Sequence, residues 1–364
     1  MKISAPASAF DAALSIVAMA ADTKNDTPLL IAADKGTVAL SVNNPRAAIS
    51  ISTTMAASIG ESGRAAVSAW RFAALQGGFG PRSIIAINTT GTAMAITCGD
   101  SKYRLQLLAD PHGGLVIDPE SGRADLASAD CLRLLEVLAT TGTEKARFYL
   151  NGVFMHNVGG RLTALGMDGA KVLRVSIATD DVLSTDDRLI VPTPAVTMLT
   201  KLLRQTKPDR VLLRRSRAVF SATAPGFEIV SGMIDAAYPD YAKVVPKPNG
   251  GSASCQRAEV LAALTRLKAV AVGEMPLIML TWADGEPLRL FLARQPDAGA
   301  DAVVAQNKGS ARKAFSLAQL TALISEFSDT AILLEAADRG LTVRQGNKFG
   351  ALMACAWYEK EIAA

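Results

Sequence analysis

The sequence has few cysteines and histidines, and its apolar residues form no long uninterrupted run. Its 364 residues include four cysteines and two histidines, and no two cysteines form a CxxC pair. This argues against a disulfide framework and against a zinc site. No apolar run approaches the roughly 20 residues that a membrane-spanning helix needs. We therefore expect a soluble protein of a reducing, cytoplasmic compartment that carries no cofactor.

The signature motifs of common enzymes are also missing, since no GxxxxGK[ST], GxGxxG or GxSxG sequence occurs. Asp180–Asp181 and Asp186–Asp187 could together hold Mg²⁺, although their spacing is more typical of a turn. His112 and His156 have no nucleophile pattern beside them. We predict neither catalytic residues nor a metal site, and an unrecognised enzyme is the alternative from another class.

The N-terminus allows two interpretations. Lys2 followed by the apolar stretch 12–20 resembles a short signal peptide. Against this, Phe10, Leu14 and Val17 recur at helical spacing. An amphipathic first helix is therefore the preferred interpretation.

The chain repeats one pattern three times. Segments 64–75, 188–199 and 312–323 each read as a strand running into an amphipathic helix, and their last leucines, at 75, 199 and 323, are 124 residues apart each time. A second helix opens each unit, at 10–20, 130–140 and 257–268. Chance alignment of amphipathic helices is the alternative explanation of this period.

The segments between these helices predict antiparallel strands. Apolar runs bounded by Gly, Asn, Asp and Pro lie at 37–42, 47–52, 83–87, 93–97, 277–281 and 288–292. Each unit is then an α+β domain with two helices on one face of its sheet. Polar, Pro/Gly-rich stretches at 118–123 and 246–252 read as linkers. They predict three domains, at 1–119, 125–246 and 253–364.

Three ordered segments of the second domain and its junction carry a family resemblance. Arg147–Gly152, Leu162–Gly169 and Tyr238–Pro246 resemble, in order and spacing, the hallmark segments of the bacterial DNA polymerase III beta subunit, the sliding clamp. The resemblance is strong in the second domain, moderate in the third and weak in the first. It implies three repeated clamp domains per chain and a head-to-tail homodimer that closes a six-domain ring around duplex DNA.

A ring that slides on DNA must attract the phosphates without contacting the base edges. We therefore expect lysines and arginines on its helices to contact the DNA. The stretch 201–217 is the most basic part of the chain. A solvated helix face is the alternative explanation for each single residue. The candidate DNA-binding residues are Lys24, Arg71, Arg133, Lys201, Arg204, Arg257, Arg266 and Lys268.

The resemblance also implies an apolar groove that captures short peptides of the polymerase, the clamp loader and repair proteins. Flexible methionines and an aromatic wall suit such capture. The matching positions are Leu150, Met167, Gly169, Ala170, Lys171, Val172, Pro239, Lys243 and Val244. Less secure positions in the third domain are Met275, Ser316, Gln319, Met353, Cys355, Ala356 and Trp357.

Ring closure is expected to join Tyr103 of one chain to Ala269 and Val270 of the other, and these small side chains predict a weaker interface than usual. Two features depart from the family. Asp168–Gly169 is followed by Ala170–Val172 where the family has His-Arg-Leu, and the chain continues beyond Trp357. The expected function is a DNA processivity factor at the bacterial nucleoid. The alternative is a diverged paralogue that serves a mobile element or a specialised polymerase.

Overall fold

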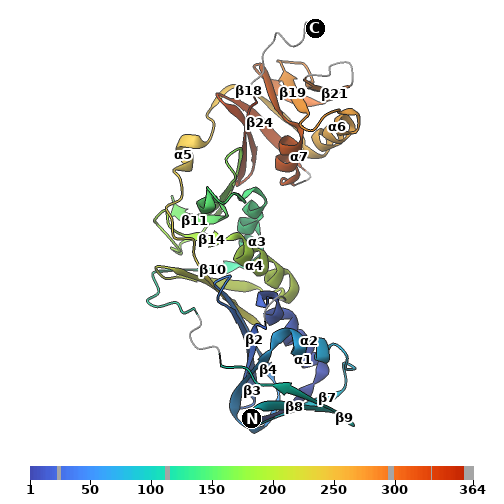
Figure 1. Ribbon diagram of the computed structural model, residues 1–364. Helices are drawn as coiled ribbons and strands as arrows, with labels where there is room; N and C mark the ends of the chain where they lie inside the picture. Colours follow the sequence, from blue (N-terminus) through green and yellow to red (C-terminus); the bar gives the residue numbers. More distant parts are fainter. Residues whose placement is uncertain (23–25, 111–114, 294–298, 329, 356–364) are drawn as a thin grey trace. The chain divides into compact units, whose positions relative to one another are not determined.

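The computed structural model describes residues 1–22, 26–110, 115–293, 299–328 and 330–355 (Figure 1). The chain forms two compact units. Unit 1 comprises Met1–Leu132, Asp181–Thr185 and Val191–Asp235, and unit 2 comprises Arg133–Asp180, Asp186–Ile190 and Ala236–Ala364. Both combine helices with antiparallel sheets, so the predicted α+β class is confirmed.

The helices follow the predicted order along the chain. They are α1 (Ala7–Val17), α2 (Ala69–Gln76), α3 (Ser128–Leu135), α4 (Thr193–Thr206), α5 (Tyr241–Val244), α6 (Arg257–Val270) and α7 (Leu317–Ser325). Short 3-10 turns lie at Ala18–Ala20, Glu136–Thr140 and Phe148–Leu150. No helix among the described residues is long and apolar enough to cross a bilayer.

Unit 1 contains a five-stranded sheet in the order β5-β1-β7-β8-β9 and an eight-stranded sheet in the order β10-β15-β16-β17-β4-β3-β2-β6. The first sheet consists of β1 (Lys2–Pro6), β5 (Ser58–Glu61), β7 (Ile84–Thr90), β8 (Ala93–Cys98) and β9 (Ser101–Gln106). The second consists of β2 (Pro28–Asp34), β3 (Thr37–Asn44), β4 (Ile49–Ala56), β6 (Gly63–Ser68), β10 (Gly122–Ala127), β15 (Arg210–Arg215), β16 (Val219–Ala224) and β17 (Phe227–Gly232).

Unit 2 contains a four-stranded sheet in the order β21-β20-β19-β23 and strands of a nine-stranded sheet in the order β14-β11-β12-β13-β26-β25-β24-β18-β22. The first consists of β19 (Leu277–Trp282), β20 (Leu288–Leu292), β21 (Ala300–Val303) and β23 (Ala311–Ser316). The second consists of β11 (Gly152–Val158), β12 (Arg161–Met167), β13 (Lys171–Ala178), β14 (Ile190–Pro192), β18 (Pro248–Gln256), β22 (Ala305–Lys308), β24 (Ala331–Ala337), β25 (Gly340–Gln345) and β26 (Lys348–Met353).

The predicted strand–helix repeat is present in all three places. Strand β6 runs into α2, β14 into α4, and β23 into α7, so the helix begins at the residue after the strand each time. The equivalent residues Val67, Val191 and Phe315 are all completely buried. In the first helix, Phe10 is buried and meets Phe72 of α2 edge to face, with ring centroids 5.9 Å apart. Helical spacing thus identified the buried faces correctly.

The two predicted linkers are partly wrong, because their glycines belong to strands. Gly122 begins β10 and pairs with Arg215. A Cβ on Gly122 would lie 2.1 Å from the carbonyl oxygen of Leu183, and one on Gly251 in β18 would lie 2.6 Å from that of Lys308. Glycine is therefore present for close approach of two backbones rather than for flexibility.

Each large sheet unites strands from two of the predicted domains. Strand β17 pairs with β4 through Ile229 and Ile51, and β13 pairs with β26 through Val172 and Ala351. The compact units accordingly divide the middle predicted domain between them. The boundaries at 1–119, 125–246 and 253–364 stay a prediction.

Candidate functional site

A cavity of about 310 Å³ lies in unit 2, where strands of the second and third repeats meet. Its wall is mainly apolar, and three basic residues contribute to it. It is lined by Arg147, Tyr149, Leu150, Met167, Gly169, Ala170, Lys171, Val172, Pro239, Val244, Pro246, Arg339, Ala351, Leu352 and Met353. We call this cavity the groove.

A tight turn between β12 and β13 forms one edge of the groove. Asp168 Oδ1 accepts hydrogen bonds from the backbone N–H groups of Ala170 (2.9 Å) and Lys171 (3.0 Å), and its Oδ2 pairs with Lys171 Nζ at 3.0 Å. Gly169 has φ +95°, a conformation that residues with a Cβ rarely adopt. A Cβ there would also lie 2.1 Å from Arg147 Nη1. Glycine therefore adopts this turn without strain, and its missing side chain leaves room for Arg147 to lie directly against it.

The second edge is the short helix α5 and the segment before it. Asp240 Oδ1 accepts a hydrogen bond from Ala242 N at 3.1 Å and so caps the helix. Tyr238 is buried and stacks on Phe154 with ring centroids 4.6 Å apart. Burial raises the pKa of the Tyr238 phenol, which stays protonated. Anchored in this way, α5 leaves Val244 49% exposed beside the groove.

The third edge is the end of β26. Lys171 pairs with Leu352 and Val172 with Ala351 across the antiparallel ladder, and Met353 N donates to Ala170 O at 2.9 Å. Main-chain hydrogen bonds thus fix the relative position of the turn and the third-repeat strand. The groove is therefore preformed and largely apolar, with basic residues in its wall. Such a site can bind a peptide by enclosing the peptide's side chains.

The basic residues on helices fall into two groups. Lys201 and Arg204, three residues apart on α4, and Lys268 on α6 are exposed. Among the described residues, none of these three side chains has a hydrogen-bonding or ion-pair partner. Their charges remain available for a polyanion.

The other basic candidates take part in contacts within the protein. Arg266 pairs with Asp301 at 2.6 Å. The hydrogen bond from Arg266 holds the pKa of the Asp301 carboxyl below its usual range. Arg71 lies 3.9 Å from Asp26 and over the ring of Trp70. Arg133 and Arg257 form hydrogen bonds within the protein. Arg133 donates to Asn347 Oδ1 at 2.7 Å, and Arg257 donates to the carbonyl oxygens of Ile324 and Ser325, at the C-terminal end of α7.

Several of the cysteines and aspartates considered above for catalysis or metal binding are buried or take part in hydrogen bonds within the protein. All four cysteines are free, and burial raises the pKa of the Cys131 and Cys255 thiols to about 12, which disfavours reactive thiolates. Asp181 Oδ2 accepts from Asp125 N at 2.7 Å, and Asp186 Oδ1 accepts from Arg188 N at 3.0 Å. Within the described ranges, no three His, Cys, Asp or Glu residues gather as a candidate metal site.

Comparison with known proteins identifies the architecture. No protein-family model matches the chain. In structure, the chain superposes on the DNA polymerase III subunit beta of Pseudomonas aeruginosa with a TM-score of 0.87 and 18% identity, covering 98% of this chain and 100% of the other. The sliding clamp of Bartonella birtlesii gives 0.85 and 22%, with the same coverage. The chain has the sliding-clamp fold.

The curated sliding clamps match in sequence over about half of the chain and about half of their own length. The beta sliding clamp of Caulobacter vibrioides is 28% identical over 167 residues, which is 43% of each chain. That of Escherichia coli is 27% identical over 190 residues, or 51% of each. The resemblance to the DNA polymerase III beta subunit is confirmed, and the chain is a divergent relative of those proteins.

The structure gathers most of the groove positions that the sliding-clamp resemblance implied. Nine of them line the cavity: Leu150, Met167, Gly169, Ala170, Lys171, Val172, Pro239, Val244 and Met353. Gln319 lines an adjoining cavity together with Gly169, Ala170 and Lys171. The sequence prediction omitted Arg147, Tyr149, Pro246, Arg339, Ala351 and Leu352. Of these, Arg147, Tyr149 and Pro246 lie in the segments that carry the resemblance, so the sequence did contain a signal for them.

The remaining predicted positions lie outside the groove lining or outside the described residues. Lys243 points to Asp240, with a separation of 3.2 Å, and its side chain is 83% exposed. Ser316 caps α7 by accepting from Gln319 N. Met275 lines a separate hollow, and Cys355 N donates to Ala314 O. Lys24, Ala356 and Trp357 lie outside the described residues.

The expected contact residues of a clamp dimer are at the surface. Tyr103 on β9 is 42% exposed and leans edge to face on Phe79 at 5.7 Å. Val270 ends α6 and is 46% exposed, and Ala269 beside it is exposed as well. These side chains can therefore be reached by a second copy of the chain.

His156 predicts a loss of stability in mild acid. Burial, and then the charge of Arg174, hold the pKa of its ring below the ordinary 6.5. The unfolded chain therefore binds a proton more readily, and the free energy of unfolding falls as the pH drops below about 6.5. Urea denaturation of His156→Phe between pH 5 and pH 8 should show a flatter dependence than the parent. Equal slopes would assign the effect to other groups.

Proposed function

We propose that the protein is a DNA sliding clamp, which encircles duplex DNA and tethers a polymerase to it through the groove. The observation that carries this proposal is the groove itself. Nine residues that the clamp resemblance assigns to peptide capture line one cavity, within a chain that has the clamp fold over 98% of its length. Repair proteins and the clamp loader would use the same cavity.

Encirclement requires a closed ring. Three repeats per chain give six in a head-to-tail homodimer, with Tyr103 of one protomer against Ala269 and Val270 of its partner. Two identical heterotypic contacts of this kind close a twofold-symmetric ring. The exposure of all three residues supports this pairing. This contact would bury Tyr103, whose ring has the largest apolar surface of the three side chains.

The proposed DNA contacts are electrostatic and independent of sequence. Lys201, Arg204 and Lys268 are the strongest candidates, because they are exposed and have no partner among the described residues. Arg71, Arg133, Arg257 and Arg266 would reach phosphates only by sharing or leaving the contacts described above. Attraction to phosphates without base readout permits sliding. Such a protein acts without catalysis, in the bacterial cytoplasm at the nucleoid.

A second candidate, a clamp paralogue for a specialised polymerase or a mobile element, is favoured by one departure in the groove. Where the family has His-Arg-Leu, this chain has Ala170–Val172, and Lys171 pairs with Asp168 at 3.0 Å. Such a rim would select a different peptide. Binding of the host replicative polymerase's peptide would favour the replicative clamp, and its absence would favour the paralogue.

Retention on DNA of different topology tests the proposed function. The protein, loaded by its cognate loader and ATP, should remain on nicked circular DNA during a high-salt wash and be lost when the same DNA is linearised. High salt removes molecules that are held by charge alone, because phosphate contacts weaken steeply with ionic strength. Equal retention on circular and linear DNA would refute encirclement.

A further inference from the structure

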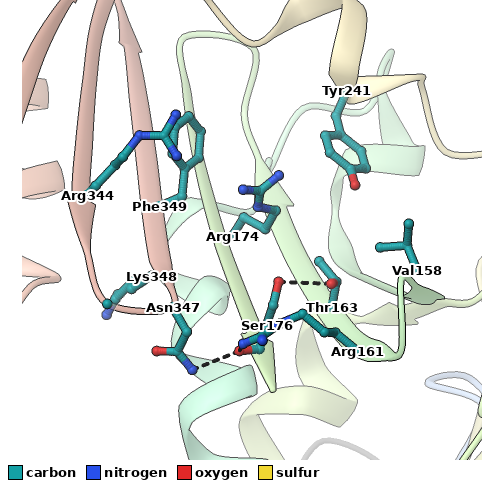
Figure 2. Close-up of a pocket in the computed structure, with 11 residues that line it drawn as sticks. Val158, Arg161, Thr163, Arg174, Ser176, Tyr241, Arg344, Asn347, Lys348 and Phe349 are labelled. Carbon is teal, nitrogen blue, oxygen red and sulfur yellow. Dashed lines mark hydrogen bonds between the residues drawn. The ribbon is translucent and has the colours of Figure 1, made fainter. Parts of the chain in front are cut away.

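A second cavity of unit 2, of about 550 Å³, lies beside α5 but is distinct from the groove in lining and character (Figure 2). Strands β12, β13, β25 and β26 supply its basic residues. Four cations line it, namely Arg161, Arg174, Arg344 and Lys348. Val158 and Tyr241 add apolar surface, and Val158 is 52% exposed. We call this cavity the arginine pocket.

Two of the four cations are already neutralised. Arg344 Nε pairs with Glu335 Oε2 at 2.6 Å, and Lys348 Nζ pairs with Glu136 Oε2 at 2.6 Å. Arg161 and Arg174 have no carboxylate partner among the described residues. The uncompensated positive charge of the pocket is therefore concentrated on these two arginines.

Both arginines are held in place by contacts that leave donors unused. Arg161 Nη2 donates to Ser176 O at 3.0 Å. Arg174 places its guanidinium over the ring of Phe349, 4.9 Å from the centroid, and projects into the cavity in Figure 2. A guanidinium has five N–H donors in a rigid fork that matches a carboxylate. Preorganised forks lose less conformational entropy when they bind an anion.

We propose that the arginine pocket is a docking site for an acidic peptide segment of a partner protein, separate from the groove. Carboxylates of this segment would bind Arg161 and Arg174, and an apolar side chain between them would pack on Val158 and Tyr241. A nucleic-acid strand fits less well, because a polyanion passing over the pocket would also meet Glu335 and Glu136. Backbone-tracking sites present a continuous basic groove instead.

Fluorescence anisotropy with a labelled hexapeptide of alternating glutamate and phenylalanine tests the proposal. The full chain should bind it more tightly than the matching glutamine–phenylalanine peptide. Arg174→Gln and Arg161→Gln should each weaken binding by about tenfold, the effect of losing a hydrogen bond to a charged group. Arg289→Gln, at an exposed arginine on β20, is the matched control and should leave the affinity unchanged.

Two further measurements separate this site from its neighbours. Val244→Gln alters the exposed edge of the groove, so the hexapeptide should still bind this variant normally. Arg161→Gln guards against a folding defect, because Arg161 lies at an exposed end of β12 whereas Arg174 packs on Phe349. The proposal is overturned if both arginine variants bind like Arg289→Gln, if Val244→Gln loses the peptide, or if labelled oligothymidylate binds the pocket more tightly than the hexapeptide.

Discussion

Gly169→Ala should abolish or strongly weaken peptide binding in the groove while leaving the protein folded. The new Cβ would lie 2.1 Å from Arg147 Nη1. Because a guanidinium is the far end of a flexible side chain, Arg147 would move away rather than unfold the turn. That movement removes part of the groove wall and breaks the Arg147–Glu144 pair, whose Nη2–Oε1 distance is 2.7 Å. We expect at least about a tenfold loss of affinity, on the scale of a lost charge-assisted contact.

The matched control is Gly159→Ala, in the turn between β11 and β12. Gly159 also has a positive φ, of +58°, but no atom lies within 4 Å of its added Cβ. Both variants incur the strain of a left-handed non-glycine residue, about 1–3 kcal/mol. Only Gly169→Ala displaces Arg147. Anisotropy with a fluorescent clamp-binding peptide measures the difference, and thermal melts of the two variants should agree. Parent-like affinity in Gly169→Ala would show that the turn takes no part in binding.

Phe315→Ala should give the largest loss of stability among the repeat positions. Phe315 is completely buried on β23, where it faces Ile278 of β19 across the ladder. Removing a buried phenylalanine costs about 3–5 kcal/mol through lost burial and the cavity left behind. Native-state hydrogen exchange should show the loss in amides of unit 2.

Phe148→Ala is the control for this experiment, since Phe148 belongs to the same unit and is 51% exposed. Its substitution should change the free energy of unfolding by less than about 1 kcal/mol, the range of most surface changes. A similar loss in both variants would mean that burial at the repeat position does not govern stability. Hydrogen exchange resolves the two units separately, which a single global transition would not.

The sequence predicted secondary structure well wherever periodicity was strong. The repeated segments that end at Leu75, Leu199 and Leu323 correctly located α2, α4 and α7, because each helix must bury one face and the buried positions recur with the helical period. Leu199 and Leu323 are buried, whereas Leu75 is only partly buried. The linkers were misjudged at Gly122 and Gly251. Composition cannot distinguish a glycine that gives flexibility from one that admits a neighbouring backbone, since the neighbour is distant in sequence.

The site was predictable only as far as the resemblance reached. The segment around Met167 and Lys171 identified the groove, and Arg147 lay in a quoted segment without being assigned to it. Arg339, Ala351 and Leu352 had no local signal, because β26 joins the groove through pairing with β13, and Arg339 precedes β25, which pairs with β26. The arginine pocket could not be predicted from the sequence either, because its residues are brought together only by strand pairing. Arg174 and Arg344, for example, both contact the ring of Phe349 only in the folded sheet.

The pairing of β13 with β26 also limits how the chain can be divided. A fragment that stops at residue 246 would keep β13 but lose its partner, and would leave Lys171, Val172 and Val175 on an open edge. Open, apolar edges recruit strands from other molecules and lead to aggregation. The second repeat is therefore not expected to be stable as an isolated domain. The strand pairs β17–β4 and β13–β26 join it by main-chain hydrogen bonds to the first and third repeats, so it is expected to fold only together with them.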